Sequence, residues 1–337
     1  MEKYLLFFLL LLVSACRSAG RDYSCSNRKI ISGTITFDLP YLTYATWDST
    51  VVVENVKTKK KLRFKTLDLC YAKPFLVKNR LYFPASNSSF WCINITSGKL
   101  VWKAKLGGKC SDFQVSGNNI IANSKNYGIL GIDGVSGLQR FRLSYKYNKA
   151  CLLPDLSPYR IKVGKSVFYI CDWQCKSLSA YECTSGELMW DKSFNEGTGN
   201  IELVRDNIFY GRNQAYEDGE VMILDLHGTI ISKQAEAFEE KFLPIVKGDK
   251  VYYYSHDSKL HEMDVLTKKS KVIFVFDEIN DVSGNQMFLM QNKLYYSAKN
   301  SVFCIDLSDF SLTKVSENLQ CDVLSFYEMN DKVEFVH

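Results

Sequence analysis

A short motif recurs along almost the whole chain at intervals of about 40 residues, and this repetition constrains the fold more than any other feature. In the clear copies a polar anchor is followed four positions later by glycine, and four positions after that by a large aromatic residue. These copies are Asn94, Gly98 and Trp102; Asp133, Gly137 and Phe141; and Glu182, Gly186 and Trp190. Weaker copies begin at Asn55, Asp225, Asp264 and Asp306. Seven units of this size predict a closed ring.

A second signal precedes the anchors. Asn79 and Asp206 each begin a short polar turn that leads into a β-branched and aromatic run, and similar runs precede most of the other anchors. Such turns and runs are typical of hairpins. The sequence therefore predicts an all-β fold, a seven-bladed β-propeller of four-stranded antiparallel blades. Eight blades are the alternative if residues 30–37 belong to an extra blade. We expect the C-terminal strand to complete the blade that the N-terminal segment begins.

The motif residues have structural roles. A carboxylate or amide at the start of a turn accepts backbone N–H bonds, glycine supplies a positive φ angle, and the aromatic side chain packs between neighbouring sheets. In two weaker copies lysine, Lys59 and Lys268, stands where glycine is expected. We expect looser or altered turns at these two positions.

The N-terminus predicts export. Residues 4–13 are entirely apolar or aromatic, which is too short for a membrane span of about 20 residues, so 1–15 is interpreted as a signal peptide. The residues before Cys16 resemble the bacterial lipobox, which implies lipidation of Cys16 and a stable membrane anchor. Ordinary cleavage, with Cys16 in a disulfide, is the alternative. Residues 16–29 then form a flexible tether and 30–337 the propeller. Arg17 after the cysteine favours an outer-membrane lipoprotein that faces the periplasm.

The repeat resembles the pyrroloquinoline-quinone-type propeller repeat over nearly the whole mature chain. A lipobox ahead of such a ring is similar to the propeller lipoprotein of the outer-membrane β-barrel assembly machinery. That resemblance implies a non-catalytic scaffold with eight blades. The adjacent cysteine pair of the longer quinone-dependent dehydrogenases is absent here. The resemblance therefore implies no cofactor.

Ten cysteines follow Cys16, and an even number in an exported chain suggests disulfides. Cys92 and Cys304 each lie two residues before an anchor, and Cys110 and Cys321 occupy corresponding later positions. Whether Cys92 bonds Cys110, and Cys304 bonds Cys321, is open, because the Cα atoms must lie within about 7 Å of each other.

The other residues of chemical interest are interpreted as structural. Cys171 and Cys175 are expected to form a disulfide, or to be two buried thiols, and no metal site is predicted. The four histidines, among them His256 and His261, are expected to be surface turn residues with no serine or carboxylate placed beside them as in a catalytic triad. The net charge of +5 is spread over many short segments, so no nucleic-acid partner is expected. The lysine-rich run 57–65 is interpreted as a solvated hairpin tip.

The longest interval between anchors, from Asp133 to Glu182, points to a binding region. Its surplus lies in residues 145–172, and Tyr159, Arg160 and Trp173 are the side-chain types that dominate protein interfaces. We therefore expect a non-enzymatic protein-binding scaffold, lipid-anchored in the bacterial envelope, which holds another envelope protein through its loops and takes part in outer-membrane protein assembly. The alternatives are a propeller hydrolase or quinone-type dehydrogenase with a central-channel site, and an accessory or toxin-neutralising protein.

Overall fold

The computed structural model of the protein describes most of the propeller region. The described residues are 30, 35–38, 40–70, 72–86, 88–124, 127–144, 159–172, 177–194, 198–213, 219–236, 238, 243–276, 287–298, 301–316, 325–329 and 332–336. The predicted signal peptide and tether, including Cys16, lie outside this part of the chain. Within it, no helix is long and apolar enough to cross a bilayer.

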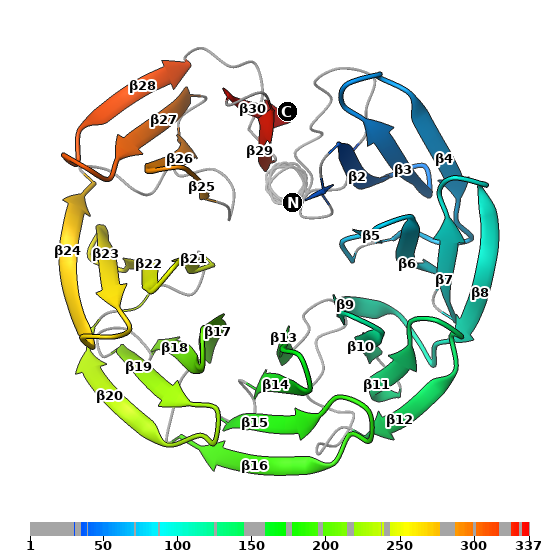
Figure 1. Ribbon diagram of the computed structural model, residues 1–337, viewed down its shortest axis with the longest axis horizontal. Helices are drawn as coiled ribbons and strands as arrows, with labels where there is room; N and C mark the ends of the chain where they lie inside the picture. The colour runs from blue at the N-terminus through cyan, green and yellow to red at the C-terminus, as the bar shows by residue number, and fades with distance from the viewer. Residues whose placement is uncertain are drawn as a thin grey trace, which may run out of the picture.

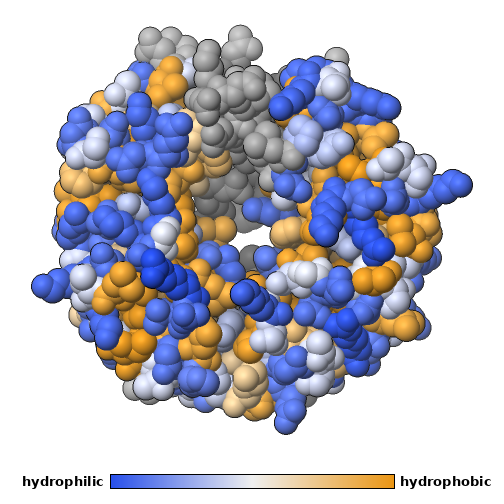
Figure 2. Space-filling model, viewed as in Figure 1, coloured by the Kyte–Doolittle hydropathy of each residue, from blue (hydrophilic) through white to orange (hydrophobic). Residues whose placement is uncertain are grey.

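Seven four-stranded antiparallel sheets are arranged around a ring, which confirms the predicted seven-bladed propeller (Figure 1). In every sheet the strands follow chain order from the centre of the ring to its rim, so each blade has an inner, a second, a third and an outer strand. The space-filling view shows an opening through the middle of the ring (Figure 2).

The blades are numbered in chain order, and their strands have the following bounds. Blades 1 and 2 contain β1 (Thr36–Asp38), β2 (Tyr41–Thr46), β3 (Thr50–Asn55) and β4 (Lys61–Lys65), then β5 (Phe75–Val77), β6 (Arg80–Ser86), β7 (Ser89–Asn94) and β8 (Lys99–Lys105). Blades 3 and 4 contain β9 (Cys110–Ser116), β10 (Asn119–Ser124), β11 (Gly128–Asp133) and β12 (Gln139–Leu143), then β13 (Tyr159–Val163), β14 (Val167–Asp172), β15 (Ser177–Glu182) and β16 (Leu188–Ser193). Blade 5 contains β17 (Thr198–Val204), β18 (Asn207–Asn213), β19 (Glu220–Asp225) and β20 (Ile230–Ala235). Blade 6 contains β21 (Ile245–Lys247), β22 (Lys250–Ser255), β23 (Lys259–Asp264) and β24 (Lys269–Val275). Blade 7 contains β25 (Phe288–Met290), β26 (Lys293–Ala298), β27 (Ser301–Asp306) and β28 (Leu312–Ser316).

The C-terminal segment differs from the expectation. It forms a hairpin of its own, β29 (Ser325–Met329) with β30 (Lys332–Val336), in the sector between blade 7 and blade 1 (Figure 1). Within the described residues it pairs with no strand of the first blade, whose inner strand β1 pairs with β2. The reason is that residues 36–38 already fill the inner position of blade 1, so that blade has no place for a C-terminal strand.

All seven anchors are the last residue of a third strand, as the repeat predicted. The Asp133 carboxylate oxygen accepts the backbone N–H groups of Val135 and Ser136 at 2.9 and 2.8 Å, and the Asn94 side-chain oxygen accepts those of Thr96 and Ser97. The hydrogen bond from the Ser136 N–H is the largest of the effects that lower the pKa of Asp133 to about 2. The anchor therefore starts the turn by occupying its free backbone donors.

The residue at the glycine position has a positive φ in every blade, whether or not it is glycine. Gly98 and Gly137 have φ values of 69° and 75°, whereas Lys59, Lys268 and Phe310 have 58°, 60° and 60°. The N–H of Lys59 and of Lys268 donates to the carbonyl of its anchor at 2.8 Å, as that of Gly98 does. The expectation of looser turns at Lys59 and Lys268 was therefore wrong. A left-handed conformation costs an L-residue about 1–2 kcal/mol, and the turn hydrogen bonds hold these lysines in it.

The motif aromatic of one blade lies on the turn glycine of the next blade. A Cβ atom added to Gly137 would lie 2.6 Å from the Trp102 ring, and Phe141 and Trp190 stand in the same relation to Gly186 and Gly228. The Trp102 indole N–H also donates to the carbonyl of Gly134 in this turn at 3.1 Å. Each of these outer strands is thus docked on its neighbour, and the predicted packing between sheets is confirmed.

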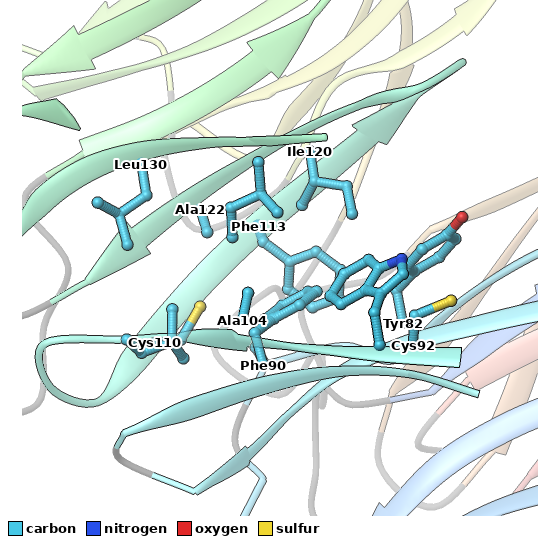
Figure 3. Close-up of a cluster of buried hydrophobic side chains, with 13 residues drawn as sticks. Tyr82, Phe90, Cys92, Ala104, Cys110, Phe113, Ile120, Ala122 and Leu130 are labelled. Atoms are coloured by element: carbon cyan, nitrogen blue, oxygen red, sulfur yellow. The ribbon is translucent and has the colours of Figure 1, made fainter. Parts of the chain in front are cut away.

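Buried apolar clusters fill the spaces between blades, and the one between blades 2 and 3 holds two cysteines (Figure 3). Phe90 lies edge-on against Phe113 at its middle, with ring centroids 4.7 Å apart. Cys92 and Cys110 lie at opposite ends of this cluster, and both thiols are free. Burial raises the pKa of Cys92 to about 11 and that of Cys110 well above its usual value. The disulfide considered between them is therefore not formed.

The other expected disulfides are not confirmed either. Cys171 and Cys304 are buried and form no disulfide, and Cys175 and Cys321 lie outside the described residues. The cysteines that recur at equivalent positions of the repeat thus occupy core positions of the blades, where a thiol packs as a small apolar side chain.

The docking of Trp102 predicts different effects of two similar substitutions. Gly98→Ala and Gly137→Ala both place a side chain at positive φ, but a Cβ at residue 98 meets nothing within 4 Å. We expect Gly98→Ala to lower the free energy of unfolding by about 1 kcal/mol from backbone strain, and Gly137→Ala by about 2–4 kcal/mol because the Trp102 ring must also move. Denaturant unfolding of the two variants measures the difference. Equal losses would show that Trp102 does not need this glycine.

Candidate functional site

The two faces of the ring differ in regularity. Because strand direction alternates, the turns from first to second strand and the anchor turns from third to fourth strand lie on one face, here called the turn face. These turns are short and alike in all seven blades. The opposite face, here called the connection face, carries the hairpins between second and third strands and the connections between blades. Its connections range from the short link Lys105–Cys110 to the long one between Leu143 and Tyr159.

The predicted binding residues belong to the connection face, although two of them are in a strand and not in a loop. Tyr159 and Arg160 begin β13, the inner strand of blade 4, at the end of the longest connection. The register places Tyr159 opposite Asp172 and Arg160 opposite Cys171. Trp173 follows Asp172 in sequence but lies outside the described residues, as do the side chains of Tyr159 and Arg160. The backbone thus brings Tyr159 to the strand end that precedes Trp173.

Charged side chains also lie on or beside the inner strands of several blades. The Lys162 ammonium on β13 lies 2.6 Å from a Glu202 carboxylate oxygen on β17. Burial raises the pKa of Glu202, an effect that Lys162 opposes. Burial lowers the pKa of Lys73, just before β5, while Asp112 on β9 raises it. The inner strands therefore offer groups of both signs, which suits polar protein surfaces better than a polyanion.

Blade 6 contains a side-chain arrangement that the sequence did not reveal. The Ser255 hydroxyl lies 2.9 Å from Nε2 of His261, and Nδ1 of the same ring lies 3.3 Å from a Glu236 carboxylate oxygen. Tyr253 stacks on His261 and donates a hydrogen bond to Glu236. His261 is only 8% exposed, so its interpretation as a surface turn residue was wrong. His261 lies on β23, next to the end of β22, which carries Ser255. Glu236 belongs to the connection between blades 5 and 6.

Serine, histidine and carboxylate are hydrogen-bonded here in the order of a hydrolytic triad. Ser255, however, is not placed to act as a nucleophile. Ser255 is 1% exposed, which leaves no access for a substrate. Its hydroxyl also contacts the Lys259 carbonyl and the Asp257 carboxylate. In blade 1, with no histidine, Thr46 makes the same two kinds of contact, to the Thr50 carbonyl and to Asp48.

The shared contacts identify Ser255 as part of a hairpin motif. In both blades the hairpin contains a serine with positive φ. The N–H of Ser49 donates to the Thr46 carbonyl, and the N–H of Ser258 donates to the Ser255 carbonyl, each at 3.1 Å. This turn therefore has a sequence signal of four residues: serine or threonine, then any residue, then aspartate, then serine. The partner Glu236 could not be found this way because it belongs to another blade.

The cluster around His261 fastens the connection between blades 5 and 6 to blade 6. Glu236 is held by Tyr253 and His261, and the backbone of Phe238 forms a bridge with that of Ser255. The Phe238 side chain is fully buried against Phe209 and Tyr253. Burial lowers the pKa of His261 and raises that of Glu236, so both groups favour their neutral forms more than they would in water.

A second polar cluster supports the hairpin between β18 and β19. The Arg212 guanidinium is bound to the Glu220 carboxylate at 2.5 Å and is only 6% exposed, and Lys233 contacts the other carboxylate oxygen at 2.5 Å. The Arg212 guanidinium also lies over the Phe194 ring at 5.5 Å. These contacts fix the base of a connection-face hairpin. In the described part of the chain, no three histidine, cysteine or acidic side chains are gathered in a way that could hold a metal ion.

Comparisons with known proteins agree on the repeat. The sequence profile of the family described as outer membrane protein assembly factor BamB matches residues 66–269, which is more than half of the chain. No curated protein matches the chain in sequence.

Three solved structures share the ring. BamB from Moraxella catarrhalis is 10% identical, with a TM-score of 0.70, and the match covers 89% of this chain and 92% of that one. The computationally designed Ika8 protein is 11% identical, with a TM-score of 0.69 and coverage of 93% and 95%. Saccharomyces cerevisiae Sqt1 is 11% identical, with a TM-score of 0.65 and coverage of 89% of each chain. At these identities the structures establish the fold alone.

The turn role of Ser255 predicts that it does not react as a nucleophile. We expect no labelling of the wild-type protein by a fluorophosphonate probe, because the hydroxyl is buried and engaged. Ser255→Ala should lower the free energy of unfolding by about 1–3 kcal/mol, since it leaves buried partners unpaired. Thr46→Ala, the matched control without a histidine, should have a loss of similar size. Mass-spectrometric detection of a phosphonylated Ser255 would contradict this role.

Proposed function

The chain belongs to the family of the outer membrane protein assembly factor BamB, and from this premise we propose that it is a non-catalytic scaffold that binds another protein of the cell envelope. The observation that supports this most is the one-sided distribution of irregular connections. The motif residues form the turns and pack neighbouring blades together, whereas the connections that differ in length and sequence lie on the connection face. A rigid ring that presents varied loops on one face is a common basis for protein recognition.

The binding region that we propose lies around the inner end of blade 4. Tyr159 and Arg160 follow the longest connection, and Trp173 comes directly after Asp172, the residue paired with Tyr159. Tyrosine, tryptophan and arginine contribute most of the binding energy in many interfaces, since they combine large contact areas with hydrogen bonds. The neighbouring pair Lys162 and Glu202 would orient polar groups of the partner. The family supports a partner in outer-membrane protein assembly.

We further propose that a lipid on Cys16 holds the ring at the periplasmic side of the outer membrane. Residues 1–15 have the composition of a signal peptide, and residues 12–16 resemble a lipobox. Several acyl chains on one cysteine give a durable anchor, because each buried methylene contributes about 0.8 kcal/mol. The tether 16–29 would allow the ring to reach a partner beside the anchor.

The proposed binding region is tested by substitution on the connection face. We expect combined Tyr159→Ala, Arg160→Glu and Trp173→Ala substitutions to abolish recovery of the partner after crosslinking in cells, while the thermal midpoint stays within a few degrees of the wild type. The matched control is Leu138→Ala, Leu266→Ala and Lys268→Ala, which alters exposed residues of the turn face and should leave recovery unchanged. Equal recovery from both triple variants would refute this location.

The anchor is tested separately. Cys16→Ala should move the protein from the membrane fraction to the soluble fraction, because no acyl chain remains to hold it. Cys25→Ala, which changes another cysteine of the same segment, should stay in the membrane fraction. Membrane retention of the Cys16 variant would argue against lipidation.

A further inference from the structure

The rim of the ring is strongly basic. In the described residues the seven outer strands contain thirteen lysine or arginine residues and a single acidic residue, Asp191. The basic residues are Lys61, Arg63, Lys65, Lys99, Lys103, Lys105, Arg140, Arg142, Lys192, Lys233, Lys269, Lys271 and Lys314. The chain as a whole is nearly balanced, with 42 basic and 37 acidic residues. Lys61, Arg140, Lys233 and Lys271 are paired with carboxylates of the adjacent third strands, and the other nine give the rim an excess of positive charge.

Protection of open edges explains only part of this pattern. An outer strand has unpaired backbone groups, and a charged side chain discourages another strand from pairing with it. Lysine is the charged side chain that edge strands use most for this purpose, so edge protection accounts for much of the positive charge on the outer strands. Edge protection does not by itself explain a place where these cations lie beside exposed apolar side chains.

The charge is densest on blades 1 and 2, where it is joined by exposed apolar side chains. We define a corner patch at the connection-face end of β4 and β8 by six exposed residues, namely Trp47, Arg63, Lys65, Leu67, Lys103 and Lys105. Trp47 and Leu67 are 52% and 71% exposed. The nearby acidic residue Asp48 offers its main-chain oxygen to Lys65. Hydrophilic side chains protrude from the rim where β4 and β8 lie (Figure 2).

The chain joins the ring in blade 1, at the connection-face end of its second strand. Ile30 forms a backbone bridge with Thr46, the residue directly before Trp47. Cys16 precedes Ile30 by fourteen residues, and a flexible chain of that length has a mean span of about 20 Å. A lipid on Cys16 would therefore keep the corner patch close to the bilayer surface.

We propose that the corner patch is a second membrane contact, which binds the anionic phospholipid surface beside the anchor. The four cations face lipid phosphates, Trp47 lies at the headgroup level, and Leu67 is buried among the acyl chains. An acidic protein would also attract the cations. The exposed tryptophan and leucine, together with the tether joining at Thr46, favour a bilayer. This inference rests on the proposed anchoring, and it orients the ring with its rim toward the membrane.

The test measures vesicle binding without the lipid. All variants carry Cys16→Ala in the full chain, so any contribution of residues 1–15 is common to them. Binding is measured by cosedimentation with vesicles of phosphatidylcholine alone, and with vesicles in which roughly a third of it is replaced by phosphatidylglycerol. One variant reverses Arg63, Lys103 and Lys105 to Glu. The matched control reverses Lys268, Lys269 and Lys314 to Glu on blades 6 and 7, with the same change in net charge.

We expect the corner-patch variant to bind phosphatidylglycerol vesicles about 100-fold more weakly than the parent, and the control variant to stay within a few-fold of it. Trp47→Ser with Leu67→Ser should also weaken binding, and this second variant tests the patch if charge reversal impairs folding. Equal binding by the two charge-reversal variants, or binding that does not depend on phosphatidylglycerol, would overturn the proposal. Normal vesicle binding with loss of a crosslinked protein would assign the patch to a protein instead. Failure of the Cys16 anchor itself appears in the cell-fractionation experiment, so the two ideas fail separately.

Discussion

The contact between an outer-strand aromatic ring and the turn glycine of the next blade is the interaction on which the packing of blades 2 to 5 depends. Each blade is a small sheet that cannot bury both of its faces alone. Trp102 on Gly137 and Trp190 on Gly228 fix the distance between neighbouring sheets, and the indole N–H of each also reaches a carbonyl of the neighbouring turn. The anchor residues hold these turns in shape, so the repeat motif and the packing of blades are one device.

The sequence was sufficient for the local part of this structure. The positions of the third strands followed from anchors such as Asp133, because turn chemistry acts over a few residues. The sequence was insufficient for features that depend on contacts with distant residues. Lys59 adopts the glycine conformation because the surrounding hydrogen bonds outweigh its preference. The contact of His261 with Glu236 joins two blades, and the free state of Cys92 depends on its place in a packed cluster. Such features have no local signature.

The candidate site follows the same division. The proposed binding region rests on the interval between anchors, which the sequence shows, whereas the ion pair of Lys162 with Glu202 depends on which inner strands are neighbours. The ring as a whole separates its tasks by position. Its turn face maintains the fold, its connection face carries the variable segments, and its rim carries the excess of positive charge.

The docking of blades also has a direction. Trp102, Phe141 and Trp190 each contact the blade that follows in sequence, so the contacts between blades 2 to 5 all run in the same direction. Beyond blade 7, the described strands β29 and β30 form a separate two-stranded sheet. The circle is mechanically unequal in its described part. Between blades 1 and 2, 5 and 6, and 6 and 7 the described residues pack through apolar side chains without an aromatic ring on a turn glycine, so resistance to opening differs around the ring.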